Sequence, residues 1–127
     1  MAIGSFRSFV LDVDDLAVAE RFWRAVLGLD PRFSAWHDQF TRLGRKGEVS
    51  VLLQRVPEPK SATKNRAHID LTVLDVPAAV AEVVALGGRV VQEPGLFPHD
   101  DPLLEWAVVC DPCGNEFCVV REVQETL

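Results

Sequence analysis

The residues Ser8–Val13, SFVLDV, and His68–Val73, HIDLTV, are two versions of one pattern, 60 residues apart. In both, apolar and polar residues alternate, which is typical of a β-strand that packs one face on an apolar core. An acidic residue follows each stretch, Asp15 in the first half and Asp75 in the second, where it can cap a helix. The sequence therefore predicts the same strand–helix unit twice.

Apolar residues then recur at helical spacing in both halves, and each predicted helix closes on a Leu-Gly pair, Leu27-Gly28 and Leu86-Gly87. Residues 57–65, rich in proline and small polar side chains, are predicted to be a linker. We expect one domain over residues 1–127, with module one at 1–56 and module two at 66–127. Further strands are predicted at 40–43, 49–54, 89–91, 106–110 and 117–120, so that each module is a strand, a helix and about three strands.

Composition excludes several classes of protein. The chain of 127 residues is 48% hydrophobic and 25% charged, close to the average of globular domains. No apolar run approaches the roughly 18 residues that cross a membrane, and the start lacks a signal-peptide pattern, so we expect a cytoplasmic protein. The net charge of −6 argues against a nucleic-acid partner, which would require a basic surface.

Three cysteines, Cys110, Cys113 and Cys118, lie close together near the C-terminus. An odd number argues against a disulfide scaffold. The first two have C-x-x-C spacing, but a turn signal, Gly114-Asn115, follows them instead of a helix. We therefore predict neither a redox pair nor a structural zinc site here.

Two motifs carry a resemblance to a known family. Residues 22–29, FWRAVLGL, and 111–117, DPCGNEF, resemble the vicinal oxygen chelate superfamily, which includes glyoxalase I, extradiol dioxygenases and bleomycin-binding proteins. Residues 54–60 and 64–71 are similar to its subgroup known as the glyoxalase-like domain. The resemblance implies an α+β fold of two tandem βαβββ modules that form a curled mixed sheet around a central cavity. It also implies a homodimer, whose second copy would cover exposed sheet edges.

Metal-binding members of this superfamily place ligands on inward-facing strand positions. By resemblance those positions fall on Ser8, His68 and Cys118, and near Val51 or Leu53. Only His68 keeps the family's ligand type, whereas Mg²⁺, Mn²⁺ and Fe²⁺ prefer carboxylate and imidazole sets. We therefore predict no metal cofactor. The alternative is a divalent metal held by His68 and Cys118, which would need a third ligand.

The strand that begins the second module predicts a polar row of His68, Asp70 and Thr72 facing a cavity. His68 is either a general base or hydrogen-bond partner oriented by Asp70, or a structural residue that ties the linker to the strand. Aromatic residues on or beside neighbouring strands would suit a planar ligand. The predicted pocket residues are Ser8, Trp36, Phe40, Thr72, Trp106 and Cys118, and the candidate catalytic residues are His68, Asp70 and Glu116.

Several functions agree with this pattern. The first is a metal-free protein that binds a small molecule, similar to bleomycin-sequestering proteins. The second is a metal-independent enzyme that acts through His68, Asp70 or Glu116. The alternative is a metal-dependent lyase, isomerase or dioxygenase with an altered ligand set. Residues 93–104 are expected to form a loop that acts as a lid over the cavity.

Overall fold

A computed structural model describes the chain except for residues 1, 3–5, 36–38, 45–47, 62, 64, 66 and 125–127, with only the backbone described at 31–35. Two compact units share the chain, residues 1–61 and 62–127. The division lies inside the segment 57–65 that the sequence marks as a linker. We call the units module one and module two and describe each by itself.

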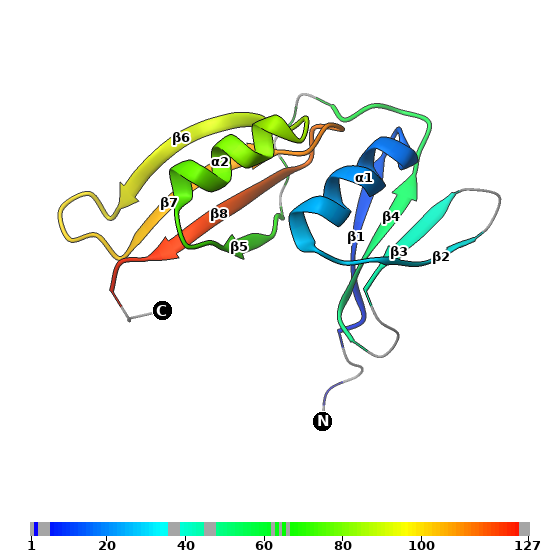
Figure 1. Ribbon diagram of the computed structural model, residues 1–127, viewed down its shortest axis with the longest axis horizontal. Coiled ribbons are helices and arrows are strands. Elements are labelled where there is room, and N and C mark those ends of the chain that lie inside the picture. The colour runs from blue at the N-terminus through cyan, green and yellow to red at the C-terminus, as the bar shows by residue number, and fades with distance from the viewer. Residues whose placement is uncertain are drawn as a thin grey trace. The chain divides into compact units, whose positions relative to one another are not determined.

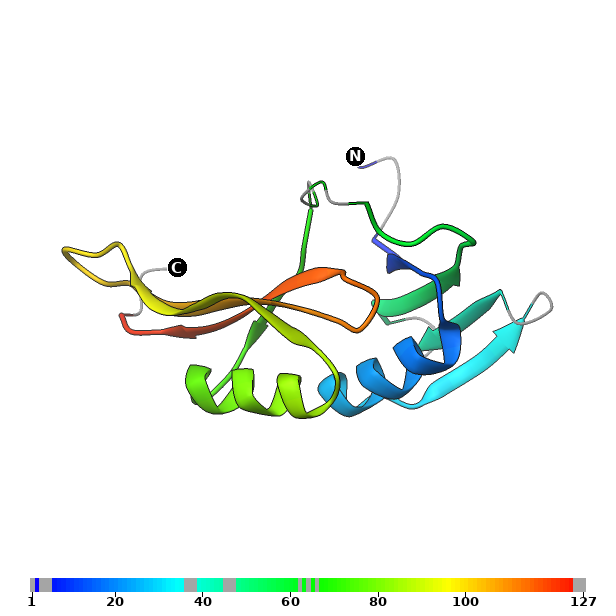
Figure 2. The same ribbon diagram turned by 90° about the horizontal axis from the view of Figure 1, so that it is seen from above.

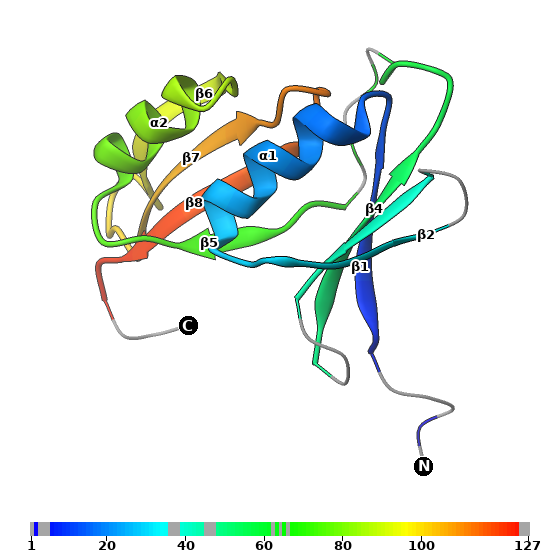
Figure 3. The same ribbon diagram turned by 45° about the vertical axis from the view of Figure 1, so that its right-hand side comes forward.

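Module one contains β1 (Ser8–Val13), α1 (Leu16–Leu27), β2 (Pro31–Ala35), β3 (Phe40–Leu43) and β4 (Ser50–Arg55). Its sheet has the order β1-β4-β3-β2, in which β1 and β4 are parallel and the other pairs are antiparallel (Figure 1). Figure 3 shows the paired strands β1 and β4 from another side, where their ribbons cross in the view.

Module two repeats this topology with β5 (Asp70–Thr72), α2 (Val76–Ala85), β6 (Arg89–Phe97), β7 (Leu104–Cys110) and β8 (Glu116–Glu122). The order is β5-β8-β7-β6, again with the first and last strands parallel. The predicted α+β fold with two βαβββ modules is therefore confirmed.

The helices begin where the sequence predicts. The Asp15 carboxylate accepts a hydrogen bond from the Val18 amide at 3.1 Å, and the Asp75 carboxylate accepts one from Ala78 at 3.0 Å. Gly28 ends α1 in the left-handed conformation at φ 66°, which glycine adopts without steric cost. In module two Leu86 is the C-cap, and the positive φ of 102° falls on Gly87.

Each helix packs on one face of its own sheet, α1 on β3 and β4, and α2 on β6, β7 and β8 (Figure 2). In module one that face carries Leu11, Val13, Leu43 and Leu53, all less than 9% exposed. Its helix contributes a T-shaped pair of buried rings, Phe22 and Trp23, with centroids 5.3 Å apart. The equivalent core of module two consists of Val76, Val80, Val83, Ala107, Val109, Phe117 and Val119.

The opposite face of each sheet is called the far face below. Successive strand residues point to opposite faces, so the buried residues and the strand register assign the far face directly. In module one it carries Ser8, Val10, Asp12, Phe40, Arg42, Ser50, Leu52 and Gln54. In module two it carries Asp70, Thr72, Trp106, Val108, Glu116, Cys118 and Val120, and the same alternation extends it to His68.

β5 covers only Asp70–Thr72 of the predicted strand 68–73, and β7 and β8 are longer than predicted. The largest differences from the sequence prediction are in two other strands. β2 was not anticipated, and β6 extends to Phe97 instead of ending at Val91, so residues 93–97 are strand and not part of a lid loop. Both are edge strands, where proline and irregular alternation are tolerated because one side needs no partner. β6 accommodates Pro94 and Gly95 through register shifts between Val90 and Gly95.

The DPCGN motif forms the turn between β7 and β8. Asp111 is fully buried, and its Oδ1 accepts hydrogen bonds from the Cys113 and Asn115 amides at 2.9 and 2.8 Å. Its Oδ2 accepts a third from the Asn115 side chain at 3.1 Å. These bonds position the start of β8, and with it Glu116 and Cys118. No helix in the described part of the chain is long and apolar enough to cross a membrane.

Gly88, where α2 meets β6, provides a test of this packing. A Cβ added there would lie 2.6 Å from the Cys110 carbonyl oxygen and 2.6 Å from Val83 Cγ1. We expect Gly88→Ala to lower the free energy of unfolding by about 2 kcal/mol, because neither neighbour can move without disturbing the core. Gly95→Ala is the matched control, since nothing lies within 4 Å of its added Cβ. Urea unfolding that shows equal stability for both variants would contradict this packing.

Candidate functional site

The far face of module two brings together three side chains of different chemistry. His68 Nε2 lies 3.3 Å from Asp70 Oδ1, and Cys118 pairs with Asp70 in the strand register. One nitrogen, one oxygen and one sulfur from these residues all lie within 4.8 Å of one another. The His68 and Asp70 side chains are 41% and 61% exposed, whereas Cys118 is buried. An imidazole and a carboxylate are thus accessible above a buried thiol.

An aromatic pair lies on the same far face. The Trp106 and Phe97 rings form a T-shaped contact with centroids 6.5 Å apart, and Phe97 is 58% exposed. Trp106 is opposite Val120, which in turn pairs with Thr72, so Trp106 and Thr72 point to the same side as the sequence predicts. Glu105, on the other face, forms an ion pair with Arg121 at 3.3 Å.

The far face of module one contains a cluster that sequence reasoning missed. Arg42 Nη1 donates hydrogen bonds to Ser8 Oγ and Ser50 Oγ, each at 2.7 Å, and the two hydroxyl oxygens lie 3.2 Å apart. Phe40, a predicted pocket residue, lies on the same face two residues before Arg42. The available signal was alternation along 40–43, which places Arg42 on the same face as Phe40.

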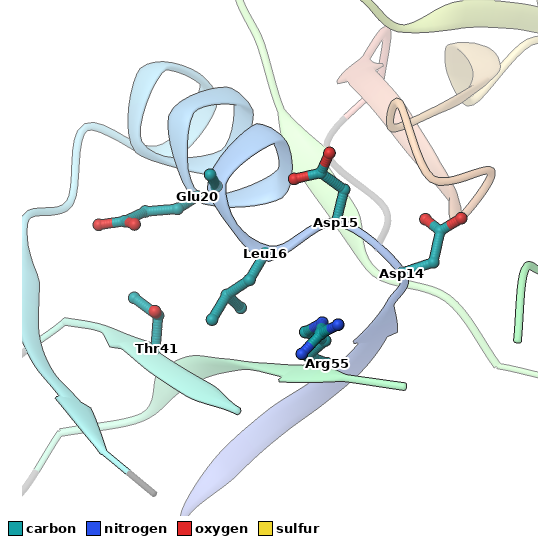
Figure 4. Close-up of a pocket in the computed structure, with 7 residues that line it drawn as sticks. Asp14, Asp15, Leu16, Glu20, Thr41 and Arg55 are labelled. Carbon is teal, nitrogen blue, oxygen red and sulfur yellow. The ribbon is translucent and has the colours of Figure 1, made fainter. Parts of the chain in front are cut away.

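A cavity of about 540 Å³ lies on the helix side of module one, between the start of α1, the start of β3 and the end of β4 (Figure 4). Its lining consists of Asp14, Asp15, Leu16, Ala17, Glu20, Thr41 and Arg55. Three carboxylates against one guanidinium favour a cationic group, and small-molecule sites are usually more apolar and aromatic than this. None of the site residues predicted from the sequence lines this cavity.

The other predicted residues are distributed as follows. Glu116 is on the far face at the start of β8, opposite Cys110. Trp36 lies outside the described residues. None of Cys110, Cys113 and Cys118 forms a disulfide. The structure thus places His68, Asp70, Thr72, Trp106, Glu116 and Cys118 on the far face of module two, and Ser8 and Phe40 on that of module one.

A family model described as "Glyoxalase-like domain" matches residues 8–120, nearly the whole chain. The chain belongs to the glyoxalase-like domain family. "Putative glyoxylase CFP32" of Mycobacterium tuberculosis is 31% identical over 117 residues, which cover 91% of this chain and 42% of that protein. The glyoxalase-like chain therefore spans less than half the length of this curated relative.

Solved structures show the same fold. Hypothetical protein SA1046 from S. aureus has a TM-score of 0.69 and 26% identity, with 94% of this chain and 97% of that chain covered. TnmS3, an antibiotic binding protein from Streptomyces sp. CB03234, has a TM-score of 0.68 and 24% identity, with 96% and 98% covered. At these identities the structures establish the glyoxalase-like fold.

The donor set of this glyoxalase-like domain does not fit a hard divalent ion. Ser8 is held by Arg42, whose positive charge would repel a cation at that position. Val51 and Leu53, expected to face inward, are instead buried on the helix side. The register shows that Leu52 is the counterpart of Cys118, because Val10 pairs with Leu52 as Asp70 pairs with Cys118. Leucine cannot be a ligand either.

Module two alone offers a softer donor set. Asp70 would supply the third ligand that the sequence did not assign to a metal, beside His68 and Cys118. Zinc accepts nitrogen, oxygen and sulfur ligands, and adjacent N and O ligands of tetrahedral zinc lie about 3.3 Å apart. The sulfur would have to approach more closely than the 4.8 Å that bounds the cluster. Zinc is therefore the ion with which these residues are most compatible.

We expect elemental analysis of the purified protein to find no stoichiometric Mg²⁺, Mn²⁺, Fe²⁺ or Ni²⁺. Added Zn²⁺ should bind through His68, Asp70 and Cys118, and Cys118→Ser should weaken that binding by about tenfold or more, because it removes the soft ligand. Cys113→Ser is the matched control, since Cys113 lies outside this cluster. Tight binding of Mn²⁺ or Fe²⁺ by the wild type would overturn the donor argument. A Cys118→Glu variant should bind these harder ions better than the wild type does, because it puts a carboxylate in place of the soft ligand beside His68 and Asp70.

Proposed function

We propose that this glyoxalase-like domain binds a small planar organic molecule on the far face of module two, without the divalent ion of the family's metal enzymes. The observation that carries the proposal is the juxtaposition on module two of the Trp106–Phe97 pair with the polar row that includes His68 and Asp70. Binding sites for small molecules combine apolar and aromatic surface with a few polar groups that fix orientation. The cavity beside α1 lacks the aromatic part of this combination.

The comparisons support a ligand of this kind. TnmS3, which shares the fold, is described as an antibiotic binding protein. A protein that sequesters a ligand requires a complementary surface and no reactive ion, which agrees with the depleted donor set. The exposed Phe97 side chain also supports a binding surface here, since large exposed apolar side chains beside polar groups are typical of binding sites.

Trp106→Ala tests the location of the site. We expect a thermal-shift screen of aromatic acids, carbonyl compounds and antibiotics to identify ligands, each of which stabilises the protein by about 2.7 kcal/mol at 100 times its dissociation constant. Trp106→Ala should then raise that dissociation constant about tenfold or more, because it removes the largest ring of the far face. Val84→Ala, an exposed apolar residue on α2, is the control and should have no effect. Unchanged affinity in Trp106→Ala would place the ligand elsewhere.

A second candidate function, metal-independent proton transfer, is favoured by the geometry of His68. Its Nε2 is paired with Asp70, and among the described residues none forms a hydrogen bond with Nδ1. A carboxylate that orients one ring nitrogen leaves the other able to accept a proton from a bound molecule. Glu116, at the start of β8 on the same face, is a further carboxylate for such a transfer.

His68→Gln separates binding from catalysis, because glutamine retains hydrogen bonding but cannot take up a proton. With a carbonyl compound identified in the screen, we expect the wild type to catalyse the exchange of solvent deuterium into that compound, at the carbon next to the carbonyl. NMR follows the exchange. His68→Gln should reduce that rate about 100-fold while its dissociation constant changes little. His99→Gln is the control, since His99 is fully exposed in another segment. If the wild type does not catalyse this exchange, the protein binds the compound without catalysing proton transfer.

A further inference from the structure

Arg42 is fixed on the far face of module one by two hydroxyl groups. Its Nη1 has two hydrogens, and both are used, one toward Ser8 Oγ and one toward Ser50 Oγ at 2.7 Å each. Ser50 is 3% exposed and Ser8 is half-buried. A guanidinium does not lose its proton in proteins, so this cluster is a permanent positive charge.

The hydrogens of the two serines can be counted. Both oxygens accept from Arg42, and their separation of 3.2 Å allows one hydroxyl to donate to the other. One hydroxyl hydrogen then has no acceptor among the described residues. Ser50 is more buried than Ser8. If the Ser50 hydroxyl donates to Ser8 Oγ, the hydrogen without an acceptor is that of the Ser8 hydroxyl, which points toward solvent. A hydroxyl that already accepts from a cation is a stronger donor.

Apolar side chains adjoin this donor. Val10 and Leu52 occupy the strand positions next to Ser8 and Ser50 on the same face, and Phe40 follows on β3. Val10 is 47% exposed. Asp12, two positions beyond Val10 and so about 7 Å further along the strand, puts a carboxylate at the other end. An aromatic molecule with one anionic end would therefore be oriented with that end at Ser8.

We propose that Arg42, Ser8 and Ser50 form an anion-binding subsite that receives a carboxylate of an aromatic ligand. The carboxylate accepts the hydrogen bond of Ser8 and is stabilised by the Arg42 charge, while the ring lies along Val10, Leu52 and Phe40. A charge-assisted bond of this type is about twice as strong as a neutral one. The inference rests on the proposed function, because it assumes that the far face of module one takes a ligand of the same class as the one proposed for module two.

The test compares 2-naphthoate with 2-naphthamide, which differ in charge but hardly in shape. We expect isothermal titration to show that the wild type binds naphthoate about tenfold or more tightly than naphthamide, despite the protein's net charge of −6. Arg42→Met, which keeps the side-chain length but removes the charge, should abolish the preference. Arg55→Met is the matched control, because Arg55 is on the same sheet but its register position faces the helix side, and the preference should persist.

Ser8→Ala provides an independent variant should Arg42→Met not fold, as judged by circular dichroism. It leaves the Arg42–Ser50 bond in place and removes the hydroxyl that accepts from Arg42 and donates to the carboxylate, so the preference for naphthoate should fall about tenfold. Equal binding of both probes by the wild type, or a preference that persists in both Arg42→Met and Ser8→Ala, overturns the subsite but leaves the proposed function intact. Binding of neither probe also overturns the subsite, and the proposed function is then tested by the Trp106→Ala comparison alone.

Discussion

The parallel pairing of the first strand of each module with its last strand determines where every functional side chain lies. β1 pairs with β4 from Ser8–Ser50 onward, and β5 pairs with β8 from Asp70–Cys118 onward. Because side chains alternate between faces, a shift of one residue would move Ser8, Arg42 and Cys118 from the far face into the helix-side core. Burial of Leu11 and Leu53 on the helix side prevents that shift, since it would expose them. The core residues therefore define the site without being part of it.

The two modules share this frame but have far faces of different chemistry. Module one carries a guanidinium between two hydroxyls, and module two carries an imidazole and a carboxylate above a thiol. Duplication of one topology explains why the positions correspond, for example Val10 with Asp70 and Leu52 with Cys118. The residues at those positions have diverged completely, from hydrocarbon to ionisable groups. The same topology thus places a guanidinium on the far face of module one and an imidazole on the far face of module two.

The sequence predicted what local chemistry determines. Alternation over Ser8–Val13 and His68–Val73 assigned faces correctly, and Asp15 and Asp75 cap the helices as expected. The prediction from sequence failed for segments whose structure depends on pairing with a neighbouring strand. β2 and the end of β6 are edge segments whose pairing overrides proline, glycine and weak alternation. The role of Arg42 depends on serines 34 residues before it and 8 residues after it, and one sequence cannot show that these three side chains meet. The same applies to Leu52, whose face follows from the register with β1.

The Arg42 guanidinium beside Ser8 favours a different chemistry from that of a metal ion at this position. A divalent ion offers open coordination positions and can make a bound water acidic, so it supports hydrolysis and oxygen chemistry as well as binding. A guanidinium has no open coordination position and gives up no proton, so it attracts an anion and holds it in a fixed orientation without activating it. Arg42 donates to two hydroxyls of the protein, whereas an ion needs about three protein ligands. Arg42, Ser8 and Leu52 therefore agree with the anion-binding role proposed above, since the charge of Arg42 repels a cation and Leu52 offers no ligand atom.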